Sequence, residues 1–398
     1  MKIALCYPSV LPQRGGCETY IARLAGRLVA DGHEVHLMAS RWDEAALPAG
    51  LRYHCVQLGA LPRFLRPWAF SRACLRLLAV ERPDVSVGFD KISGVDVYYP
   101  QGGDYDASVK MSLGKHRWAV MRGLLHAMKW FEPAHLSFLA LERAQYRRPG
   151  SLIVAISGMV RSHLIERHGL PPERVPLLPI GIPAARSHQE VSPARRAEVR
   201  HSWGVGPDDV VAVFAAMNYR LKGLAPLLRA LGRLRDRRLH LIVAGQSSQI
   251  EFRLMARRRG LSDRVHFLGY CRNMREVYAA SDLLVHPTFY DPCSNVVLEA
   301  LAGGLPVITT RCNGASELMH PSGPDGRCLE GFVLPRPHDH RHLARALEHL
   351  LDPQVRAACG TEAVRAAAGW TFEDHYQGLL DILRRASRST ALPAARVG

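Results

Sequence analysis

The sequence contains no run of about 20 apolar residues, the length that a membrane-spanning helix needs. It also has no C-x-x-C pair, no H-E-x-x-H motif and no Cys/His ligand spacing among its nine cysteines and 19 histidines. These absences argue against a disulfide framework and a zinc site, and they favour free thiols in a reducing compartment. The N-terminal run MKIALCYPSV is too short for a signal peptide and meets Pro8 early. We therefore expect a cytoplasmic protein.

Acidic residues are few beside basic ones, because 36 Asp and Glu against 52 Lys and Arg give a formal net charge of +16. Such an excess implies an anionic partner, which can be a nucleic acid, an anionic membrane face or an acidic substrate. Apolar residues make up 47% of the chain, as in soluble globular proteins. At 398 residues the chain is too long for one ordinary core, so we expect two domains.

Short apolar runs alternate with helical patterns in both halves of the chain, for example Lys2–Tyr7 in the first half and Val210–Ala215 in the second. This rhythm predicts an α/β fold with two doubly wound, Rossmann-like domains that face each other across a cleft. The Pro- and Gly-rich segment Pro171–Pro183 is the best candidate for the boundary. We predict one domain over residues 1–180 and a second over residues 181–371.

The stretch FYDPCSNVVLEALAGG carries two acids, Asp291 and Glu299, around an expected helix start. Ser294 is a plausible N-cap, so the backbone N–H groups of Asn295 and Val296 would be free to bind a phosphate or a sugar hydroxyl. The alternative is a capped surface helix with incidental acids. From this stretch alone the two interpretations are equally good.

A loop follows the first strand of each expected domain. In the first domain, Gly15-Gly16 lets the backbone come close to a ligand, unless it is only a tight turn. In the second, Arg220 and Lys222 can each neutralise a phosphate, and fixed cations stabilise a diphosphate as its bond to a sugar breaks. The alternative is a solvated helix start, although a cation there opposes the helix dipole. With two cations available a metal is not needed, and we predict none.

Two further candidates are weaker. The stretch Gly88–Asp106 is rich in Gly, Asp and Tyr, and we expect a strand followed by a functional loop whose part Gln101–Asp104 reaches the cleft. A long surface loop is the alternative. His286, at the end of an expected strand, is a secondary catalytic candidate, although a lone histidine is more often a packed one.

The segment 110–148 is strongly basic, since residues 107–148 contain eight Lys or Arg and only two Glu. A stripe of positive charge with a seven-residue repeat lies beside apolar residues at helical spacing, and Trp130 and Phe131 follow. Such a basic amphipathic helix is typical of a helix in an anionic membrane interface. The alternative is a packed helix with a solvated basic face. The stripe is Lys115, Arg122 and Lys129, and the apolar set is Trp118, Met121, Leu125 and Met128.

These motifs together resemble the retaining glycosyltransferases of family 4, which have the two-domain architecture called GT-B. The resemblance covers nearly the whole chain and rests on the GG loop, the Arg220-x-Lys222-Gly223 pattern, and the stretches LHLIVAG, ASDLLVHPT and EALAGGLPVITT. The acid-x7-acid spacing from Asp291 to Glu299 is its most specific part. Within the family, VGFDKISGVDVYYPQGG and the basic segment are similar to the lipopolysaccharide core glucosyltransferase I group.

The resemblance implies a role for each candidate residue. Glu299 would bind the ribose of a nucleotide, and Asp291, which replaces the usual Glu, would bind the donor sugar. Arg220 and Lys222 would bind the diphosphate, and Gly15-Gly16 would give it room. Asp104 is the candidate for contacting the acceptor. The amides of Ser294, Asn295 and Val296 would contact the sugar or phosphate, and the base would lie near Gly245 and the loop that contains Tyr270, Asn273 and Met274.

The activity implied is transfer of a hexose, glucose, from a UDP-sugar to a lipid-linked acceptor such as the inner-core heptose of lipopolysaccharide. It would proceed with retention, without a metal or other cofactor, on the inner face of the cytoplasmic membrane. A C-terminal helix over about 372–390 would pack on the N-terminal domain. The alternatives are another family 4 transferase with a different donor or a polyprenyl-linked acceptor, a nucleotide-sugar 2-epimerase, or a basic nucleic-acid-binding protein. We expect no nucleic-acid partner, because no recognition motif is visible.

Overall fold

The computed structural model describes residues 1–12, 15–116, 118–182 and 191–391. The chain forms two compact units. Unit 1 comprises residues 1–113, 118–179 and 373–398, and unit 2 comprises residues 114–117 and 180–372. The division after Pro179 lies next to the boundary expected from the Pro- and Gly-rich segment. The prediction that the two sheets face one another across a cleft stays a prediction.

Unit 1 contains a six-stranded parallel sheet in the order β5-β3-β1-β6-β7-β8 and a small parallel pair, β2-β4. Its strands are β1 (Lys2–Cys6), β2 (Ser9–Val10), β3 (Glu34–Ala39), β4 (Arg41–Trp42), β5 (Arg52–Cys55), β6 (Val85–Gly88), β7 (Val97–Tyr98) and β8 (Leu152–Ile153). Its helices are α1 (Gly16–Ala30), α2 (Arg66–Glu81), α3 (Tyr105–Ser112), α4 (Ala119–Lys129), α5 (Pro133–Arg147), α6 (Gly158–His168) and α14 (Phe372–Ala391), of which the first residue falls in unit 2.

Unit 2 contains a seven-stranded sheet in the order β11-β10-β9-β12-β13-β15-β14, parallel except for the last pair. Its strands are β9 (Val210–Ala215), β10 (Leu239–Ala244), β11 (Val265–Gly269), β12 (Leu283–Val285), β13 (Val307–Thr310), β14 (Arg327–Cys328) and β15 (Gly331–Leu334). Its helices are α7 (Pro193–Ser202), α8 (Leu224–Leu231), α9 (Ile250–Arg257), α10 (Met274–Ala279), α11 (Asn295–Ala302), α12 (His340–His349) and α13 (Pro353–Ala368).

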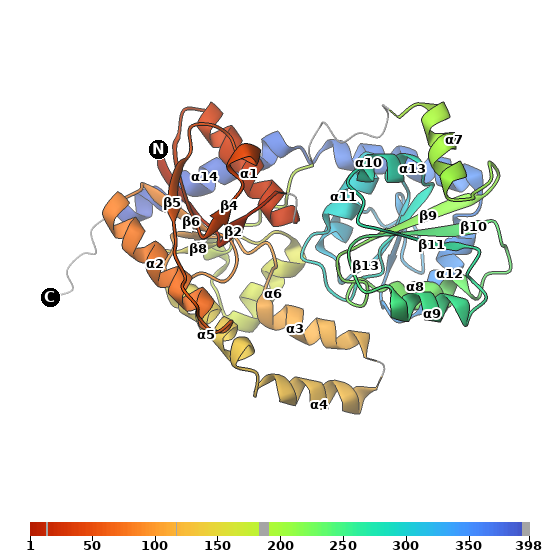
Figure 1. Cartoon of the computed structure of the whole chain (residues 1–398), viewed down its shortest axis with the longest axis horizontal. Helices are drawn as coiled ribbons and strands as arrows, with labels where there is room; N and C mark the ends of the chain where they lie inside the picture. Colours follow the sequence, from red (N-terminus) through yellow and green to blue (C-terminus); the bar gives the residue numbers. More distant parts are fainter. Residues whose placement is uncertain (13–14, 117, 183–190, 392–398) are drawn as a thin grey trace. The chain divides into compact units, whose positions relative to one another are not determined.

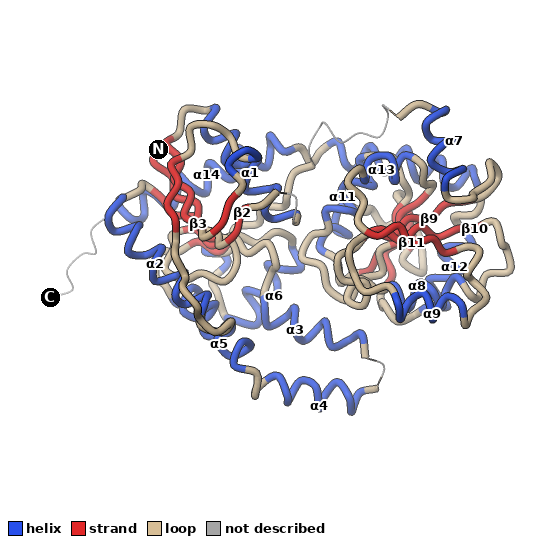
Figure 2. The backbone as a smooth tube through the Cα atoms, in the orientation of Figure 1, coloured by secondary structure: helices blue, strands red, loops and turns tan. Residues whose placement is uncertain are grey.

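Helices cover both faces of the sheet in unit 2. Helix α8 packs against α9 and α12 on one face, and α11 packs against α13 on the other (Figure 2). All six residues of β9 and all six of β10 are therefore buried, which explains why these strands are continuous apolar runs rather than alternating patterns. Each sheet is a parallel α/β sheet, as the alternating pattern predicts, so ligands are expected beyond the carboxyl ends of the strands.

Helix α14 returns to unit 1 after the whole of unit 2. In Figure 1 it is the blue helix beside the red helix α1. The buried His375 Nδ1 donates to the backbone oxygen of Pro179 at 2.6 Å, and His375 Nε2 accepts from the Tyr20 hydroxyl at 2.7 Å. Tyr376, Leu379 and Leu383 of this helix are fully buried. The C-terminal helix is therefore part of the core of unit 1.

Two sequence-based expectations need correction. The supposed functional loop after β6 returns to the sheet as strand β7, and its Tyr98 and Tyr99 are fully buried. The basic segment is three helices, α3, α4 and α5, rather than one. Among the described residues, every helix is too short or too polar to cross a membrane.

Candidate active site

The loop that carries Lys222 is attached to the loop that carries Asp291. Gly223 has φ of 87°, and a Cβ at this position would overlap the backbone oxygen of Pro287, so the turn requires glycine. Two residues before Gly223 on the first loop and two after Pro287 on the second, the backbone N–H of Phe289 donates to the oxygen of Leu221 at 2.9 Å. Both loops follow carboxyl ends of neighbouring strands, β9 and β12, where a ligand site is expected.

Lys222, Asp291 and His286 form one buried cluster. Lys222 Nζ lies 2.7 Å from Asp291 Oδ2 and 3.1 Å from the backbone oxygen of Tyr290. His286 Nε2 lies 3.3 Å from the same Asp291 Oδ2, and the imidazole stacks on Phe214. The side chains of Lys222, Asp291 and His286 are 19%, 12% and 2% exposed. The structure thus gives the secondary candidate His286 a direct contact with the first acid of the motif.

The electrostatics of the cluster favour an ionised Asp291. Burial by itself would raise the pKa of the Asp291 carboxyl, but the charge of Lys222 and the hydrogen bond from His286 outweigh it and hold that pKa well below its usual range. Burial lowers the pKa of His286 despite the nearby carboxylate, so the neutral imidazole donates its Nε2–H to Asp291. A fixed carboxylate and a fixed ammonium group therefore stand side by side at neutral pH.

Asn313 anchors the Asp291 loop, and the sequence analysis did not identify it. The side chain is fully buried; its Oδ1 accepts from the backbone N–H of Ser294 at 3.2 Å, and its Nδ2 donates to Thr309 Oγ1 at 3.0 Å. Its two chain neighbours complete the attachment, since Asp291 N–H donates to the oxygen of Cys312 and Gly314 N–H donates to the oxygen of Asp291, both at 2.9 Å. The only available signal was an Asn-Gly pair after a strand, which is ordinarily a turn signal.

Helix α11 begins at Asn295, directly after the predicted N-cap residue. Ser294 occupies the N-cap position, but its side chain makes no capping hydrogen bond, so the predicted side-chain cap is wrong. Within the described part of the chain, the backbone N–H groups of Asn295 and Val296 have no hydrogen-bond acceptor. A helix start with free donors favours an anion or a sugar hydroxyl.

Glu299 lies in the second turn of α11, and its carboxylate accepts a hydrogen bond from a tyrosine. The hydroxyl of Tyr278, a buried residue of α10, lies 3.0 Å from Glu299 Oε2. The Glu299 side chain is only partly buried, so the carboxylate is oriented without being enclosed. Tyr278 is a second residue that the sequence analysis missed, because only the tertiary structure brings α10 to α11.

The region expected to hold a base is built on close backbone contacts. Gly245 follows β10 with φ of 124°, and a Cβ there would overlap the backbone oxygen of Ala216. Its N–H donates to the oxygen of Gly269, and its own oxygen accepts from the Tyr219 hydroxyl, both at 2.7 Å. The other expected residues lie in the next loop, where Tyr270 is 52% exposed, Asn273 precedes α10 and Met274 is its first residue.

One expected cation has another partner, and three expected site residues belong to unit 1. The Arg220 side chain is 65% exposed, and its Nε lies 2.8 Å from Glu251 Oε2 on α9, so the guanidinium is paired with that carboxylate. Asp104 is fully buried, caps α3 through the N–H groups of Asp106 and Ala107, and contacts His168 Nε2 at 3.0 Å. A carboxylate with no exposed surface has no atom to offer an acceptor, so that expectation is corrected. Gly15-Gly16 belongs to unit 1, at the start of α1.

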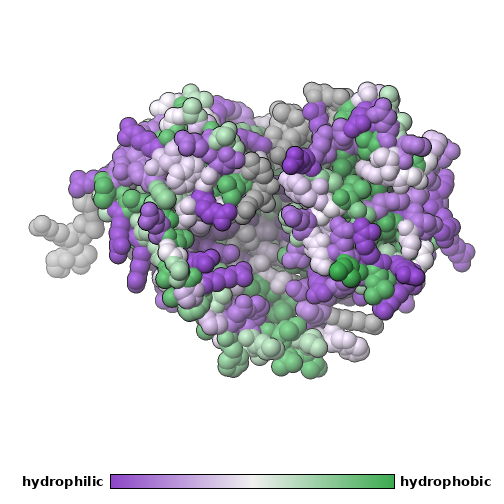
Figure 3. Space-filling model, viewed as in Figure 1, coloured by the Kyte–Doolittle hydropathy of each residue, from purple (hydrophilic) through white to green (hydrophobic). Residues whose placement is uncertain are grey.

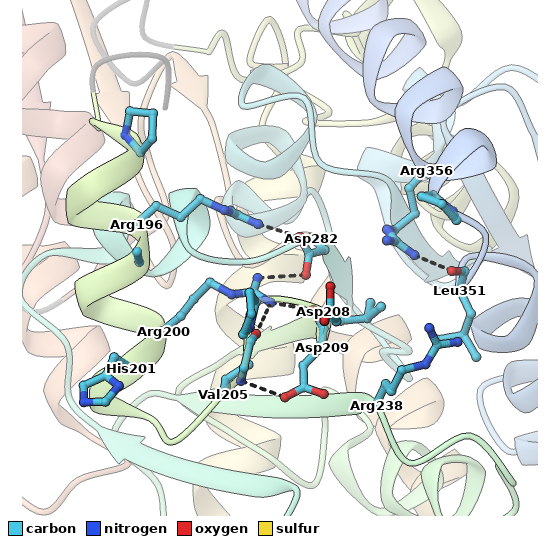
Figure 4. A pocket seen from close by; sticks show the side chains of 16 residues that line it. Arg196, Arg200, His201, Val205, Asp208, Asp209, Arg238, Asp282, Leu351 and Arg356 are labelled. Carbon is cyan, nitrogen blue, oxygen red and sulfur yellow. Dashed lines mark hydrogen bonds and ion pairs between the residues drawn. The ribbon is translucent and has the colours of Figure 1, made fainter.

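A cavity of about 940 Å³ lies at the opposite, amino ends of β9 and β12 (Figure 4). Four arginines line it, and those of α7 point at Asp282: Arg200 Nη1 lies 3.1 Å from Asp282 Oδ2, and Arg196 Nη1 donates to the backbone oxygen of Ser281 at 3.0 Å. Arg356 donates to the oxygens of Leu350 and Leu351 at the end of α12. The arginines of α7 attach that helix to the sheet, Arg356 links α13 to the end of α12, and the cavity shares no lining residue with the Asp291 cluster.

Two family models match most of the chain. The model described as Glycosyltransferase Family 4 matches residues 14–186, and that described as Glycosyl transferases group 1 matches residues 208–353. The chain is 26% identical to the lipopolysaccharide glucosyltransferase WaaG of Escherichia coli over 88% of its length and 90% of that protein. It is 27% identical to a GDP-mannose-dependent phosphatidylinositol monomannoside mannosyltransferase of Mycobacterium tuberculosis, over 94% of this chain and 95% of that protein.

Solved structures share the fold. The crystal structure of WaaG superimposes with a TM-score of 0.79 at 24% identity, covering 96% of this chain and 99% of the other. The Anabaena protein HepE in complex with UDP-glucose superimposes with a TM-score of 0.69 at 19% identity, covering 96% and 99%. Two parallel α/β units with these matches define a GT-B glycosyltransferase. The chain belongs to the family 4 glycosyltransferases, as its motifs indicate.

Proposed function

We propose that this enzyme transfers glucose from UDP-glucose, with retention of configuration and without a metal, to a lipid-linked saccharide such as the inner-core heptose of lipopolysaccharide. The observation that carries the proposal is the ion pair of Lys222 with the buried Asp291, on a loop that leads directly into the free N–H groups of α11. The likeness to WaaG over 88% of the chain supports the choice of donor and acceptor.

In the proposed reaction each group of unit 2 has one task. The ammonium group of Lys222 and the α11 amides stabilise the negative charge that develops on the diphosphate as its bond to the sugar breaks. Asp291, freed from part of its contact with Lys222, accepts hydrogen bonds from sugar hydroxyls while His286 keeps it in place. Glu299, oriented by Tyr278, accepts hydrogen bonds from the ribose. The acceptor attacks from the face that the diphosphate leaves.

The proposal is tested with UDP-glucose and a heptose-terminated lipid acceptor. The expected result is one added hexose in the mass spectrum of the product, with the anomeric configuration of the donor. A panel of UDP- and GDP-sugars offered with the same acceptor gives the donor specificity. The proposal is refuted if UDP-glucose is neither bound nor transferred while another nucleotide sugar is.

We also propose that helix α4 places the enzyme on an anionic membrane at the cytoplasmic face. The apolar side chains of this segment are exposed rather than packed, as the green surface at the position of α4 indicates (Figure 3). Val120 and Phe131 are 85% and 86% exposed. An exposed apolar surface with lysine and arginine beside it favours a membrane interface. We define this α4 patch as Trp118, Val120, Met121, Leu124, Met128, Trp130 and Phe131.

Flotation with anionic and with neutral vesicles tests the membrane proposal. We expect binding to anionic vesicles that weakens as salt rises. The triple change of Lys115, Arg122 and Lys129 to Glu should abolish it, and Val120→Ser with Phe131→Ser should weaken it at every salt concentration. Equal retention of the triple variant would exclude this surface. Transfer to a short, water-soluble acceptor should be unchanged in these variants, which separates the membrane contact from the chemistry.

A further inference from the structure

A histidine and carboxylate cluster in unit 1 has no part in the proposed reaction. His36 lies on β3, His54 on the outermost strand β5, and Glu81 is the last residue of α2. His36 Nδ1 lies 2.8 Å from His54 Nε2 and 3.5 Å from Glu81 Oε2, and each residue has a potential ligand atom within 4.8 Å of the other two. Three separate elements thus bring two imidazoles and one carboxylate to a common point.

A fourth residue fixes the orientation of the central ligand. Glu34 Oε1 lies 2.9 Å from His36 Nε2, so that nitrogen carries the hydrogen and donates it to the carboxylate. His36 Nδ1 therefore presents its lone pair to His54 and Glu81. A carboxylate on the far nitrogen is the usual arrangement for a metal-binding histidine, because it fixes the tautomer and raises the basicity of the ligand.

Burial and spacing also suit an ion. His36 is fully buried, whereas the side chains of His54 and Glu81 are 17% and 26% exposed and leave a path from solvent. Two ligands of a tetrahedral zinc ion, each about 2.0–2.1 Å from the metal, lie about 3.3 Å apart, so the two imidazoles need to separate by only a few tenths of an ångström. Imidazole ligands favour Zn²⁺, Ni²⁺ or Cu²⁺ over Mg²⁺ or Ca²⁺.

We propose that His36, His54 and Glu81 bind a divalent transition-metal ion such as Zn²⁺, with water as the fourth ligand. The ion would join the edge strand β5 to its neighbour β3 and to the end of α2, and would stabilise unit 1. Lys2 and Glu34 are the first residues of β1 and β3, so the Glu81 and Glu34 side of the cluster lies toward the amino ends of these strands, whereas ligands of such sheets bind at the carboxyl ends. The site is therefore structural and takes no part in glycosyl transfer.

One cation competes with the metal for a ligand, and a second pairs with the orienting carboxylate. Lys2 Nζ lies 3.1 Å from Glu81 Oε2, and Arg52 Nη1 lies 2.8 Å from Glu34 Oε1. Lys2 must leave the Glu81 carboxylate before that oxygen can coordinate an ion. Removing the lysine charge should therefore tighten metal binding, an effect that no general loss of structure would produce.

Unit 2 offers a matched control. His240 on β10 and His266 on the outermost strand β11 also stack, with His240 Nδ1 3.1 Å from His266 Nε2. Here the nearest carboxylate, Asp209, lies 3.4 Å from the other nitrogen of His240. Among the described residues, His36, His54 and Glu81 are the group of this kind whose ligand atoms converge. The second pair shares the stacking but lacks a third ligand at the common point.

The test uses the full chain, stripped with a chelator and titrated with Zn²⁺ by calorimetry. Wild-type enzyme should bind one equivalent more tightly than His54→Gln and Glu81→Gln by at least tenfold, His240→Gln should match the wild type, and Lys2→Met should bind several-fold more tightly. Circular dichroism verifies that each variant is folded. Anomalous diffraction at the zinc edge should give a peak between the three ligands. Equal affinity in wild type, His54→Gln and Glu81→Gln, or an equal loss in His240→Gln, would overturn the proposal.

Discussion

Each unit has a glycine in its first strand-to-helix loop, at the same place in its sheet. The two glycines differ in whether the backbone conformation and packing require them. Gly15, before α1, has an extended φ of −174°, and a Cβ there would approach only the flexible Glu18 side chain, at 2.6 Å from Oε2. Gly223, before α8, has φ of 87° and lies against the backbone of Pro287. The fold therefore requires glycine in unit 2 and tolerates a side chain in unit 1.

This difference separates a structural glycine from a ligand-binding one. In unit 2 the glycine allows the loop of Lys222 to lie against the loop of Asp291. In unit 1 the described fold leaves room for a side chain at Gly15. If glycine is needed there, the reason must be the close approach of a ligand. Substitutions in the two loops therefore test different things, and the expected effects fall into an order.

The largest effect should come from Lys222→Ala. We expect kcat/KM to fall about 10²–10³-fold, because the variant loses the cation that stabilises the leaving diphosphate and leaves the carboxylate of Asp291 buried without its partner. Initial rates with UDP-glucose measure this. Lys222→Arg, which keeps the charge, serves as the control and should retain more activity. A loss below tenfold in Lys222→Ala would remove this lysine from the chemistry.

The second effect should be a loss of stability in unit 1 at acidic pH. Burial lowers the pKa of His375 to about 4, although the hydrogen bond to Pro179 opposes this. The unfolded chain binds a proton near pH 6.5, so the stabilisation is complete above that pH and is lost as the pH falls from 6.5 to 4, by about 3 kcal/mol. Urea denaturation at pH 7.5 and pH 4.5 measures the loss, and hydrogen exchange locates it in α14.

His375→Gln is the control for that prediction. It should be less stable than wild type at pH 7.5 but should lose less stability on acidification. Asp291 has the same sign but acts at lower pH, because a carboxyl with a lowered pKa contributes stability above its unfolded pKa of about 4 and loses it below. A wild-type-like pH slope in His375→Gln would show that other groups cause the acid sensitivity.

The third effect compares the two glycines directly. Gly223→Ala should destabilise the protein by about 2–3 kcal/mol, because the alanine combines a positive φ with an overlap with backbone atoms. Gly15→Ala should change the free energy of unfolding by less than about 0.5 kcal/mol. If Gly15→Ala nevertheless weakens donor binding, measured by calorimetry with UDP-glucose, the expected role of Gly15-Gly16 is supported. Unchanged donor affinity would contradict that role.

Smaller effects are expected at the periphery of the site. Tyr278→Phe removes the hydrogen bond to Glu299 and should raise the KM for UDP-glucose several-fold, equivalent to about 1 kcal/mol, with kcat nearly unchanged. Tyr53→Phe, on the edge strand β5 of unit 1, is the matched control. A fall in kcat with constant KM would mean that the tyrosine acts on the chemical step instead.

The smallest effect should come from Arg220→Ala. The guanidinium is exposed and paired with Glu251, and exposed pairs contribute at most about 1 kcal/mol. We expect kcat/KM within a few-fold of wild type. A loss as large as that of Lys222→Ala would show that Arg220 leaves Glu251 and reaches the diphosphate when the donor binds.

The sequence predicted the parts of the site that depend on local spacing. The strand rhythm predicted both sheets, and the motif around Asp291 and Glu299, with Lys222, indicated the family. It did not predict that His286 would bind Asp291, or that Asn313 would hold the loop, because these contacts depend on how neighbouring strand ends meet in three dimensions. In a sequence, a polar residue that follows a strand gives the same signal whether its role is catalysis, anchoring of a loop or capping of a helix.

Asp104 and Ser294 illustrate the opposite error. Asp104 lies in a Gly-rich stretch that predicts a loop, yet its carboxylate caps α3 and is fully buried. Ser294 has a residue type that usually caps helices, but the buried Asn313 takes its backbone N–H and its hydroxyl makes no cap. Burial decides both cases, and burial of a polar side chain cannot be read from its neighbours in sequence.

The return of α14 to unit 1 has a consequence for synthesis on the ribosome. Strands β1 to β8 emerge first, but Leu379, Leu383 and His375, which complete the core they form, are translated only after all of unit 2. At about 5–20 residues per second, synthesis of Ile180–Phe372 takes roughly 10–40 s. During that time the nascent unit 1 has an open apolar groove where α14 will bind. We expect the N-terminal half to depend on chaperones until the last helix arrives, and the C-terminal unit to finish folding first.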